Sequence, residues 1–256
     1  MTGVVALVAG VFGLAVGSFL NVVVHRVPRG ESVATPRSRC PGCGTTIAAR
    51  DNVPVLSWLL LRGRCRTCGE PISARYPLIE LATAGLFVAA GLRFGAAWEL
   101  PAFLVFFAAL LALSAVDLER FILPNRILYP GWLAVAVLLL AAAALDPDWR
   151  SLRDAAIGAA AAWAVFFVIH IVSPGGMGFG DVRLSGLIGT ALGWLSLGHV
   201  FLGLFLGFLV ATVLSLALMA GGRRGRKDKI PFGPFLAVGA ALAVLGGHPI
   251  LDWYLG

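Results

Sequence analysis

The sequence predicts an all-α polytopic membrane protein with about eight transmembrane helices and a cytoplasmic zinc-binding loop domain between the first two helices. Hydrophobic residues make up 59% of the 256 residues and charged residues only 13%, and the mean hydropathy is +0.90. The chain therefore has more apolar surface than a soluble domain can bury. The apolar residues form runs of membrane-spanning length, most basic residues lie between alternate runs, and the one long polar segment carries the cysteines.

Each expected transmembrane helix is a separate apolar run, because a helix needs roughly 17–25 apolar residues to cross the bilayer core. The runs cover residues 3–24, 77–95, 99–116, 127–145, 153–172, 183–197, 199–220 and 232–250. The sixth run is the shortest of them. The first run has no basic segment before it and no small-residue cleavage site after it, so we expect no cleavable signal peptide.

The distribution of basic residues predicts which loops face the cytoplasm. Of the 20 Lys and Arg residues, 17 fall in alternate loops, within residues 25–75, 117–126, 173–183 and 222–230. Cytoplasmic loops carry the excess of basic residues, so these loops are expected in the cytoplasm and both termini outside. The net charge of +7 then reflects membrane orientation and anionic headgroups, and we expect no nucleic-acid partner. One basic run is expected to anchor the topology: Arg223, Arg224, Arg226, Lys227 and Lys229.

The long polar loop contains two C-x-x-C pairs, Cys40 with Cys43 and Cys65 with Cys68. Each pair places two thiolates around a tight turn, and two such turns supply the four sulfurs of a tetrahedral zinc site. A glycine follows the second cysteine of each pair, where a fold-back of the backbone favours glycine. Two disulfides are the alternative, which the reducing cytoplasm disfavours. With four thiolate ligands the zinc would be structural, without an open coordination position.

Two aspartates stand where an apolar run meets a polar turn. Asp117 lies in SAVDLERFILPN and Asp181 in GMGFGDVRL. A carboxylate beside hydrocarbon is costly, which points to a function, although helix caps or interfacial anchors are an alternative. Gly178 and Gly180 come shortly before the second aspartate, and without Cβ atoms they let backbone, or an extended peptide, approach its carboxylate.

Glu80 is a third carboxylate near an apolar run, four residues after Tyr76 and at the start of the second expected helix. It lies either at the level of the lipid headgroups or against an interior polar site. The sequence leaves both placements open.

Several motifs occur together in a characteristic order. They are GSFLNVVVHRVPR, CPGC, NVPVLSWLLLRGRC, CRTCGEPISARYPLIEL, VDLERFILPN, GMGFGD and IPFGPFLAVG. In this order the chain resembles the type IV prepilin peptidases, membrane aspartyl proteases of the GxGD type, from Gly17 to about Gly239. Two residues depart from the expected family pattern: Asn125 stands where Asp is expected, and Arg183 where Lys is more usual. Neither departure removes a catalytic carboxylate.

The resemblance implies an activity and its substrates. Prepilin peptidases cut the short basic leader from type IV prepilins and from the pseudopilins of type II secretion, at a glycine before the hydrophobic helix and on the cytoplasmic side. Many also methylate the new N-terminus with S-adenosylmethionine, an activity associated with a cytoplasmic domain like residues 25–76. The expected location is the bacterial inner membrane, with the zinc domain and the active site toward the cytoplasm.

The resemblance also implies roles for individual residues and domains. Asp117 and Asp181 would form the catalytic dyad, with Gly178 and Gly180 shaping the site. Apart from the resemblance, the basic leader needs an acidic or polar contact in the cytoplasm, for which Glu119 is a candidate, and Glu80 is a candidate to bind substrate or shape the site. The expected domains are a first transmembrane helix (1–24), a cytoplasmic zinc-binding domain (25–76) and a membrane-embedded aspartyl peptidase domain (77–256).

A transporter or scaffold that binds cations or protons at its membrane aspartates is the alternative function. A transporter favours carboxylates near the middle of the bilayer and broken helices in paired halves. Here both aspartates stand at the ends of apolar runs on one expected face, and the halves show no evident duplication. The pattern therefore favours the peptidase.

Overall fold

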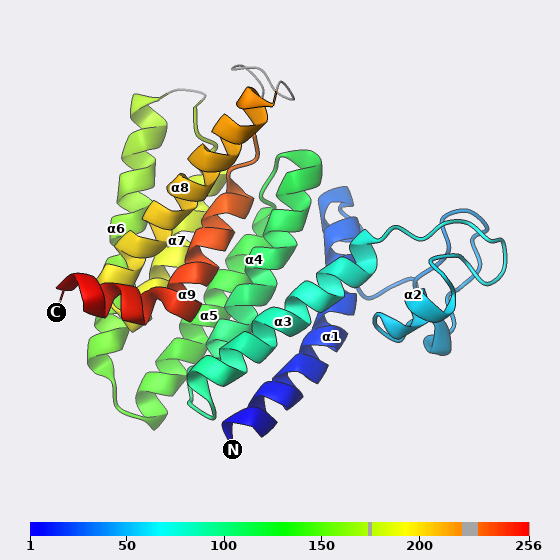
Figure 1. Ribbon diagram of the computed structural model, residues 1–256, viewed down its shortest axis with the longest axis horizontal. Coiled ribbons are helices and arrows are strands. Elements are labelled where there is room, and N and C mark those ends of the chain that lie inside the picture. The colour runs from blue at the N-terminus through cyan, green and yellow to red at the C-terminus, as the bar shows by residue number, and fades with distance from the viewer. Residues whose placement is uncertain (174–175, 222–229, 256) are drawn as a thin grey trace. The chain divides into compact units, whose positions relative to one another are not determined.

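The computed structural model describes residues 1–173, 176–221 and 230–255, and the basic run expected to anchor the topology lies outside these residues. The chain forms two compact units, Met1–Ala97 and Trp98–Gly256. Within the described residues the regular structure is helical, apart from two isolated β-bridges (Figure 1). The all-α prediction is confirmed.

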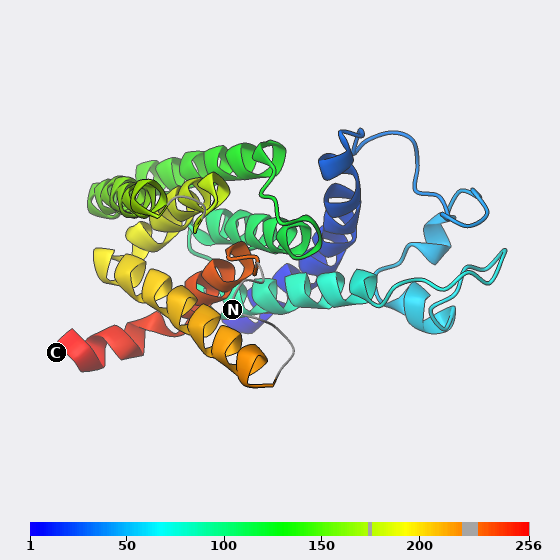
Figure 2. The ribbon, with the colours of Figure 1, turned by 90° about the horizontal axis from the view of Figure 1, so that it is seen from above.

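The first unit consists of two long helices joined by the polar loop. The long helices are α1 (Thr2–Arg26) and α3 (Arg75–Phe94), and the loop holds the short elements η1 (Val27–Arg29), η2 (Ala49–Asp51) and α2 (Leu56–Leu60). Figures 1 and 2 show α1 and α3 packed along each other, with the loop extending from one end of the pair.

Glycines allow α1 and α3 to approach closely. A Cβ atom at Gly17 would lie 2.6 Å from the Cα of Glu80, and one at Gly91 would lie 2.7 Å from the Cα of Ala6. These distances leave no room for a side chain, so small residues hold the two backbones together in the manner of packed membrane helices. The start of α3 is thereby fixed against the end of α1.

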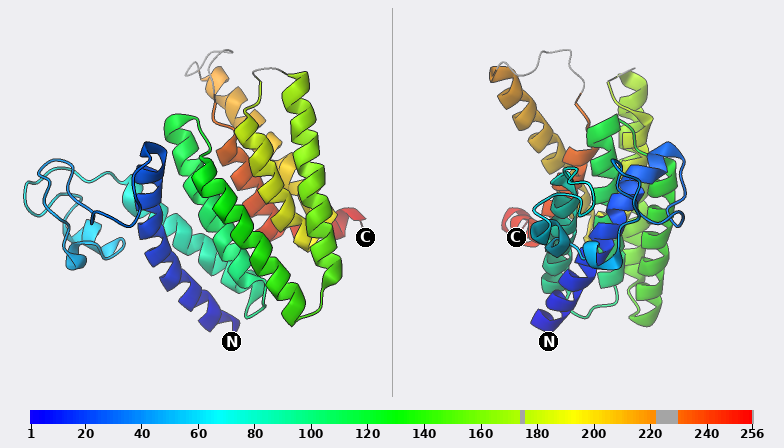
Figure 3. Two further views of the ribbon diagram at one scale, coloured as in Figure 1. Left: turned by 180° about the vertical axis from the view of Figure 1, so that it is seen from behind. Right: turned by 90° about the vertical axis from the view of Figure 1, so that its right-hand side faces the viewer.

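The second unit is a bundle of the remaining helices (Figure 3). They are α4 (Leu100–Arg120), α5 (Asn125–Leu145), α6 (Trp149–Val172), α7 (Phe179–Leu195), α8 (Leu197–Ala220) and α9 (Gly233–Leu255). Helix α7 packs against α5, α6, α8 and α9, and nearly every residue from Asp181 to Trp194 is buried. It forms the centre of this unit.

Seven of the helices in the described residues are long and apolar enough to cross a membrane. The remaining apolar run, the sixth (183–197), corresponds to α7, which has only 17 residues. This helix begins at Phe179 and not at 183, because the polar turn continues directly into its first turn. It ends at Leu195 because the Ser196 side chain accepts a hydrogen bond from the His199 N–H and caps the next helix.

Large apolar side chains remain exposed along the outer surfaces of the helices. Examples are Leu7 on α1, Leu133 on α5 and Phe201 on α8, the last with 74% of its surface exposed. Side chains of this size in contact with water would be unfavourable over so many positions, whereas lipid accommodates them. The protein is a multi-pass membrane protein.

Candidate active site and metal centre

Asp117 lies in the last turn of α4, and only 5% of its surface is exposed. The helix ends because Phe121 adopts a left-handed conformation (φ 56°), from which its N–H donates to the Asp117 carbonyl oxygen at 2.9 Å. The carboxylate of Asp117 accepts a hydrogen bond of 3.1 Å from the N–H of Gly233, the first residue of α9. The aspartate is thus held between the end of one helix and the start of another.

Asp181 lies in the first turn of α7, with 8% of its surface exposed. Its N–H donates to the carbonyl oxygen of Gly178, which is extended (φ −72°, ψ 145°) and precedes the helix. A Cβ atom at Gly178 would lie 3.3 Å from the Oδ2 atom of Asp181. The missing side chain therefore leaves one side of this carboxylate unobstructed.

Leu123 links the surroundings of the two aspartates. A Cβ atom at Gly180 would lie 3.1 Å from the Cβ of Leu123, and one at Gly233 would lie 3.2 Å from the Leu123 Cδ2. The same position at Gly233 is 2.9 Å from the Asp117 Oδ2. The two carboxylates are close enough to repel each other electrostatically. The fold thus brings the paired aspartates from α4 and α7 to one place, beside the start of α9.

The sequence did not identify Leu123 or Gly233 as residues that surround the two aspartates. Both lie in quoted motifs, VDLERFILPN and IPFGPFLAVG. The signal for Gly233 was a glycine beside proline at the start of an apolar run, a position that often permits close backbone approach. Its partner, however, lies 116 positions away in the chain, and no local pattern reveals that contact.

The two other predicted carboxylates have different surroundings. Glu119 is exposed at the end of α4. Glu80 belongs to the first unit, where it is 7% exposed on α3. Of the two placements that the sequence left open for Glu80, the structure has the interior one.

The two departures from the family pattern are in direct contact. The Arg183 Nη1 atom donates a hydrogen bond to the Oδ1 atom of Asn125. The guanidinium also lies over the ring of Phe179, 4.5 Å from its centroid, a favourable cation–π geometry. The first residue of α5 is thereby tied to the fifth residue of α7, two residues after Asp181.

The four cysteines converge in the loop of the first unit. Their sulfur atoms all lie within 4.8 Å of one another, and the Sγ atoms of Cys40 and Cys68 are 3.7 Å apart. Four sulfurs at the zinc–thiolate distance of about 2.3 Å, arranged as a tetrahedron, lie about 3.8 Å apart. The spacing fits a metal bound by four thiolates.

The two cysteine turns have the same backbone geometry. The N–H of Gly44 donates to the carbonyl oxygen of Cys40 (2.9 Å), and that of Gly69 to the carbonyl oxygen of Cys65 (3.0 Å). Both glycines have positive φ, 70° and 75°, as a fold-back around each thiol pair requires. Hydrogen bonds to Thr45 lower the pKa of the Cys43 thiol to about 6, which favours the thiolate that a metal binds.

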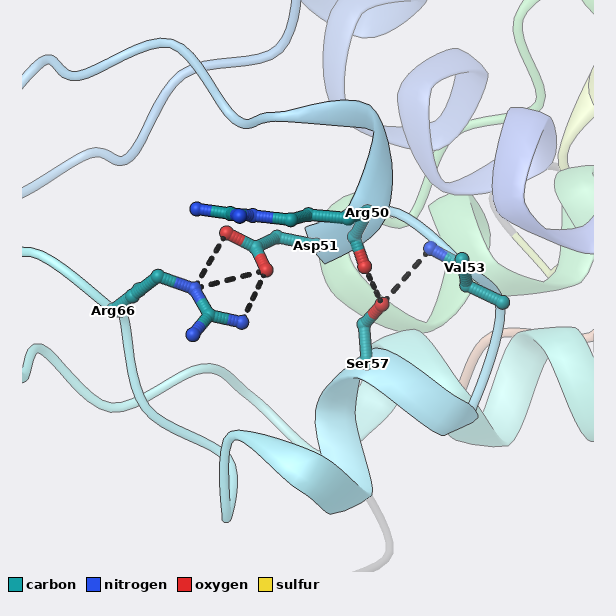
Figure 4. Close-up of polar contacts among 5 residues, drawn as sticks. All are labelled: Arg50, Asp51, Val53, Ser57 and Arg66. Atoms are coloured by element: carbon teal, nitrogen blue, oxygen red, sulfur yellow. Dashed lines mark hydrogen bonds and ion pairs between the residues drawn. The ribbon is translucent and has the colours of Figure 1, made fainter.

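Outside the cysteines the loop is held by a few polar contacts. Asp51 and Arg66 form an ion pair of 2.6 Å, and this pair holds the pKa of the Asp51 carboxyl below its usual range. The hydroxyl of Ser57 donates to the Arg50 carbonyl oxygen at 3.0 Å and accepts from the Val53 N–H at 2.9 Å (Figure 4). Among the loop residues 27–74, only three are buried: Cys40, Ser57 and Gly63. A bound metal would supply much of the order that so small a core cannot.

Comparisons with known proteins match most of the chain to two protein families. The profile of the bacterial peptidase A24 N-terminal domain matches residues 11–94, and that of the type IV leader peptidase family matches residues 104–219. No solved structure gave a significant match.

Several curated relatives are similar over most of the chain, and each is named prepilin leader peptidase/N-methyltransferase. That of Aeromonas hydrophila is 38% identical over 95% of this chain and 91% of its own length. That of Bacillus subtilis is 37% identical over 96% of each chain. That of Myxococcus xanthus is 44% identical over 86% of this chain and 65% of its own length. The chain therefore belongs to the type IV leader peptidase family.

Proposed function

We propose that this protein cleaves the leader from type IV prepilins or pseudopilins with Asp117 and Asp181, and methylates the new N-terminus. The observation that carries the proposal is the meeting of two buried carboxylates beside Leu123, from helices far apart in the chain. Family membership supports the reaction class, and the names of the relatives support both activities. Neither the family membership nor the names of the relatives support a transporter or scaffold.

The paired aspartates are suited to hydrolysis without a nucleophile on the enzyme. Two carboxylates that repel each other in a largely dry site resist double ionisation, so the pair retains one proton. The ionised member takes a proton from water as the water attacks the scissile carbonyl carbon. The protonated member donates its proton to the carbonyl oxygen. The N–H of Gly233 orients the Asp117 carboxylate for its part in this exchange.

The glycines before α7 provide room for the peptide to be cut. Gly178 is extended, and its missing side chain leaves space next to the Asp181 carboxylate. A cleavage segment unwound into an extended strand would pass there, because a helical segment hides its carbonyl carbon within its own hydrogen-bonded turns. Glu119, exposed two residues after Asp117, would contact the basic leader.

The expected orientation places the active site and the cysteine loop on the cytoplasmic side of the plasma membrane. The support is the bias of 17 of the 20 basic residues toward the same set of loops. Asp117 and Asp181 both stand at the ends of their helices that adjoin these loops. Leader residues synthesised in the cytoplasm would reach them directly.

The metal of the cysteine cluster is zinc in this proposal. The sulfur spacing and the matching backbone turns support it, and four thiolates around one ion leave no position for a substrate. Zinc would therefore order the loop and take no part in chemistry. The methyl donor would be S-adenosylmethionine, which supplies an electrophilic methyl group, and the N-terminal unit would carry this second activity.

The direct test is to incubate the purified protein with a leader-bearing prepilin, with and without S-adenosylmethionine, and to weigh the products. The proposal predicts loss of the leader in both cases and a gain of one methyl group only with the donor. An uncut prepilin after incubation with zinc-loaded protein would contradict it. Metal analysis of the same preparation should give one zinc per chain.

A further inference from the structure

A second buried polar cluster lies in the first unit, between α1 and α3, and the leader cleavage described above does not use it. Its members are Ser18 and Asn21 on α1 and Glu80 on α3. Asn21 is 3% exposed and Glu80 7% exposed. Gly17 brings the two helices together at this level, because its Cβ position is 2.6 Å from the Glu80 Cα. A carboxylate inside a helix pair of this kind is a candidate functional group.

The cluster has more hydrogen-bond acceptors than donors. The amide nitrogen of Asn21 donates to the carbonyl oxygens of Tyr76 (3.1 Å) and Gly17 (3.3 Å). This arrangement fixes the direction of the amide, because both neighbours are acceptors. Its Oδ1 atom is buried and, among the described residues, has no hydrogen-bond partner. Asn21 lies one helical turn after Gly17, the residue that meets Glu80, and its amide reaches Tyr76, one turn before Glu80. An unmatched buried oxygen at this level of the helix pair is suited to a ligand that donates N–H groups.

The group that now meets the carboxylate is a backbone N–H from the loop. The Oε2 atom of Glu80 accepts a hydrogen bond of 2.7 Å from the N–H of Val55, and the Ser18 side chain lies near the same carboxylate. Val55 has φ 61° and ψ −51°, and the Leu56 N–H donates to the Pro54 carbonyl oxygen at 2.6 Å. This is the strained form of the γ-turn, rare for any residue and especially costly for a β-branched one.

Strain of this kind persists only where the surroundings impose it. Here one of the contacts on the turn is the hydrogen bond from the Val55 N–H to the Glu80 carboxylate. A ligand that offered its own N–H groups to the carboxylate would release the turn into an ordinary conformation. The Val55 N–H therefore stands in for a donor on the ligand.

We propose that Glu80 and Asn21 form a binding site for a primary ammonium group, the α-amine that leader cleavage creates at the start of the pilin's hydrophobic segment. The inference rests on the proposed function, since that amine is the acceptor of the methyl group. An α-ammonium offers three N–H donors and one positive charge. These match the Glu80 carboxylate and the unpaired Asn21 oxygen, and the apolar segment that follows would lie along the membrane helices.

A purely structural role for Glu80, as an anchor of the Val55 turn, makes a different prediction. Glu80→Gln keeps an oxygen that accepts from the Val55 N–H and fits the same volume, but it removes the negative charge. If Glu80 only anchors the Val55 turn, the substitution should leave the turn in place. If Glu80 binds an ammonium group, the substitution should abolish that binding. Glu31→Gln is the matched control, because Glu31 is an exposed carboxylate of the same unit.

The experiment measures binding of two synthetic apolar peptides to the detergent-purified, full-length protein. One has a free N-terminal amine, and the other is identical but N-acetylated. Wild-type protein and the Glu31→Gln variant should bind the free-amine peptide about 10- to 100-fold more tightly than the acetylated peptide. This is the difference in affinity that charge-assisted hydrogen bonds contribute. Glu80→Gln should bind both peptides equally, and Glu80→Asp, which keeps the charge, should retain part of the preference.

Two results would overturn the inference: equal binding of both peptides by wild-type protein, or an undiminished preference in a Glu80→Gln variant. The wild-type comparison holds even if the variant fails to fold, which its zinc content and melting temperature would reveal. Failure of the proposed function is a separate outcome, because it appears as wild-type protein that neither cleaves a prepilin nor methylates the product. Binding is measured without either reaction.

Discussion

At the scale of single residues, the chain provides carboxylates and thiolates that the sequence alone could identify, because charge beside an apolar run and paired cysteines are local patterns. Asp117, Asp181 and the four cysteines were found in this way. Gly233 was not, since its importance comes from a carboxylate on another helix. Local patterns reveal which groups are chemically unusual, whereas tertiary contacts decide what orients them.

Substitution of Gly233 by alanine should therefore impair cleavage. The added Cβ would lie 2.9 Å from the Asp117 Oδ2, so the carboxylate must shift, and a displacement near 1 Å in a positioned site costs about 100-fold in rate. The measurement is kcat/KM for leader cleavage. Gly246→Ala on the same helix is the control, since its Cβ would meet nothing within 4 Å. Equal rates for both variants would remove Gly233 from the site.

At the scale of elements, the helices follow the apolar runs closely except where a polar turn leads directly into a helix. The start of α7 at Phe179 is the clearest case. The loop expected over 173–183 fills the gap between two apolar runs, but Asp181 and Arg183 both lie inside α7. The favourable interaction of an acidic residue with a helix N-terminus explains part of this. The hydrogen bond from Arg183 to Asn125 is a further contact of this part of the helix.

Arg183 and Asn125, the two departures from the family pattern, should affect cleavage in a coupled way. Arg183→Lys alone should lower cleavage about tenfold, because a lysine loses both the planar stacking on Phe179 and the forked donor geometry. Adding Asn125→Asp should recover much of the loss by forming an ion pair with that lysine. A double-mutant cycle on kcat/KM should give a coupling of about 1 kcal/mol. Strictly additive effects would show that the contact does not matter for activity.

The cysteine loop should depend on its metal. Cys40→Ser should release zinc and loosen the loop, because a structural metal contributes directly to folding. Cleavage should fall only in part, since the paired aspartates belong to the other compact unit. Metal analysis and limited proteolysis of the loop are the measurements. Wild-type protein that carried two disulfides and no stoichiometric zinc would contradict the assignment.

At the scale of the whole molecule, the compact units are set by packing between helices. The first unit ends at Ala97 because the glycines of α1 and α3 hold these two helices together. The division into 1–24, 25–76 and 77–256 follows composition and expected chemistry, and it stays a prediction about function. Sequence composition does not predict the boundary between the two compact units. That boundary depends on which helices pack together, and the packing depends on glycines that are far apart in the chain.

The orientation in the membrane is open to a test at the same scale. Gly30→Cys lies in the loop expected in the cytoplasm, and Asp146→Cys lies in a loop expected outside. A membrane-impermeant thiol reagent applied to intact cells should label the second and not the first. The wild-type protein gives the background from its own cysteines. Labelling of both positions from one side would contradict the eight-helix topology.

The central claim is that Asp117 and Asp181 act together, and their replacement by asparagine tests it most directly. Each variant keeps the size of the side chain but removes the shared proton, so Asp117→Asn and Asp181→Asn should each abolish leader cleavage. Zinc content and membrane insertion should stay unchanged. Asp146→Asn, an exposed aspartate of the same unit, should cleave normally. The product mass after incubation with a prepilin decides the matter: an intact leader with both variants is the predicted result, and full cleavage by either variant would contradict the account.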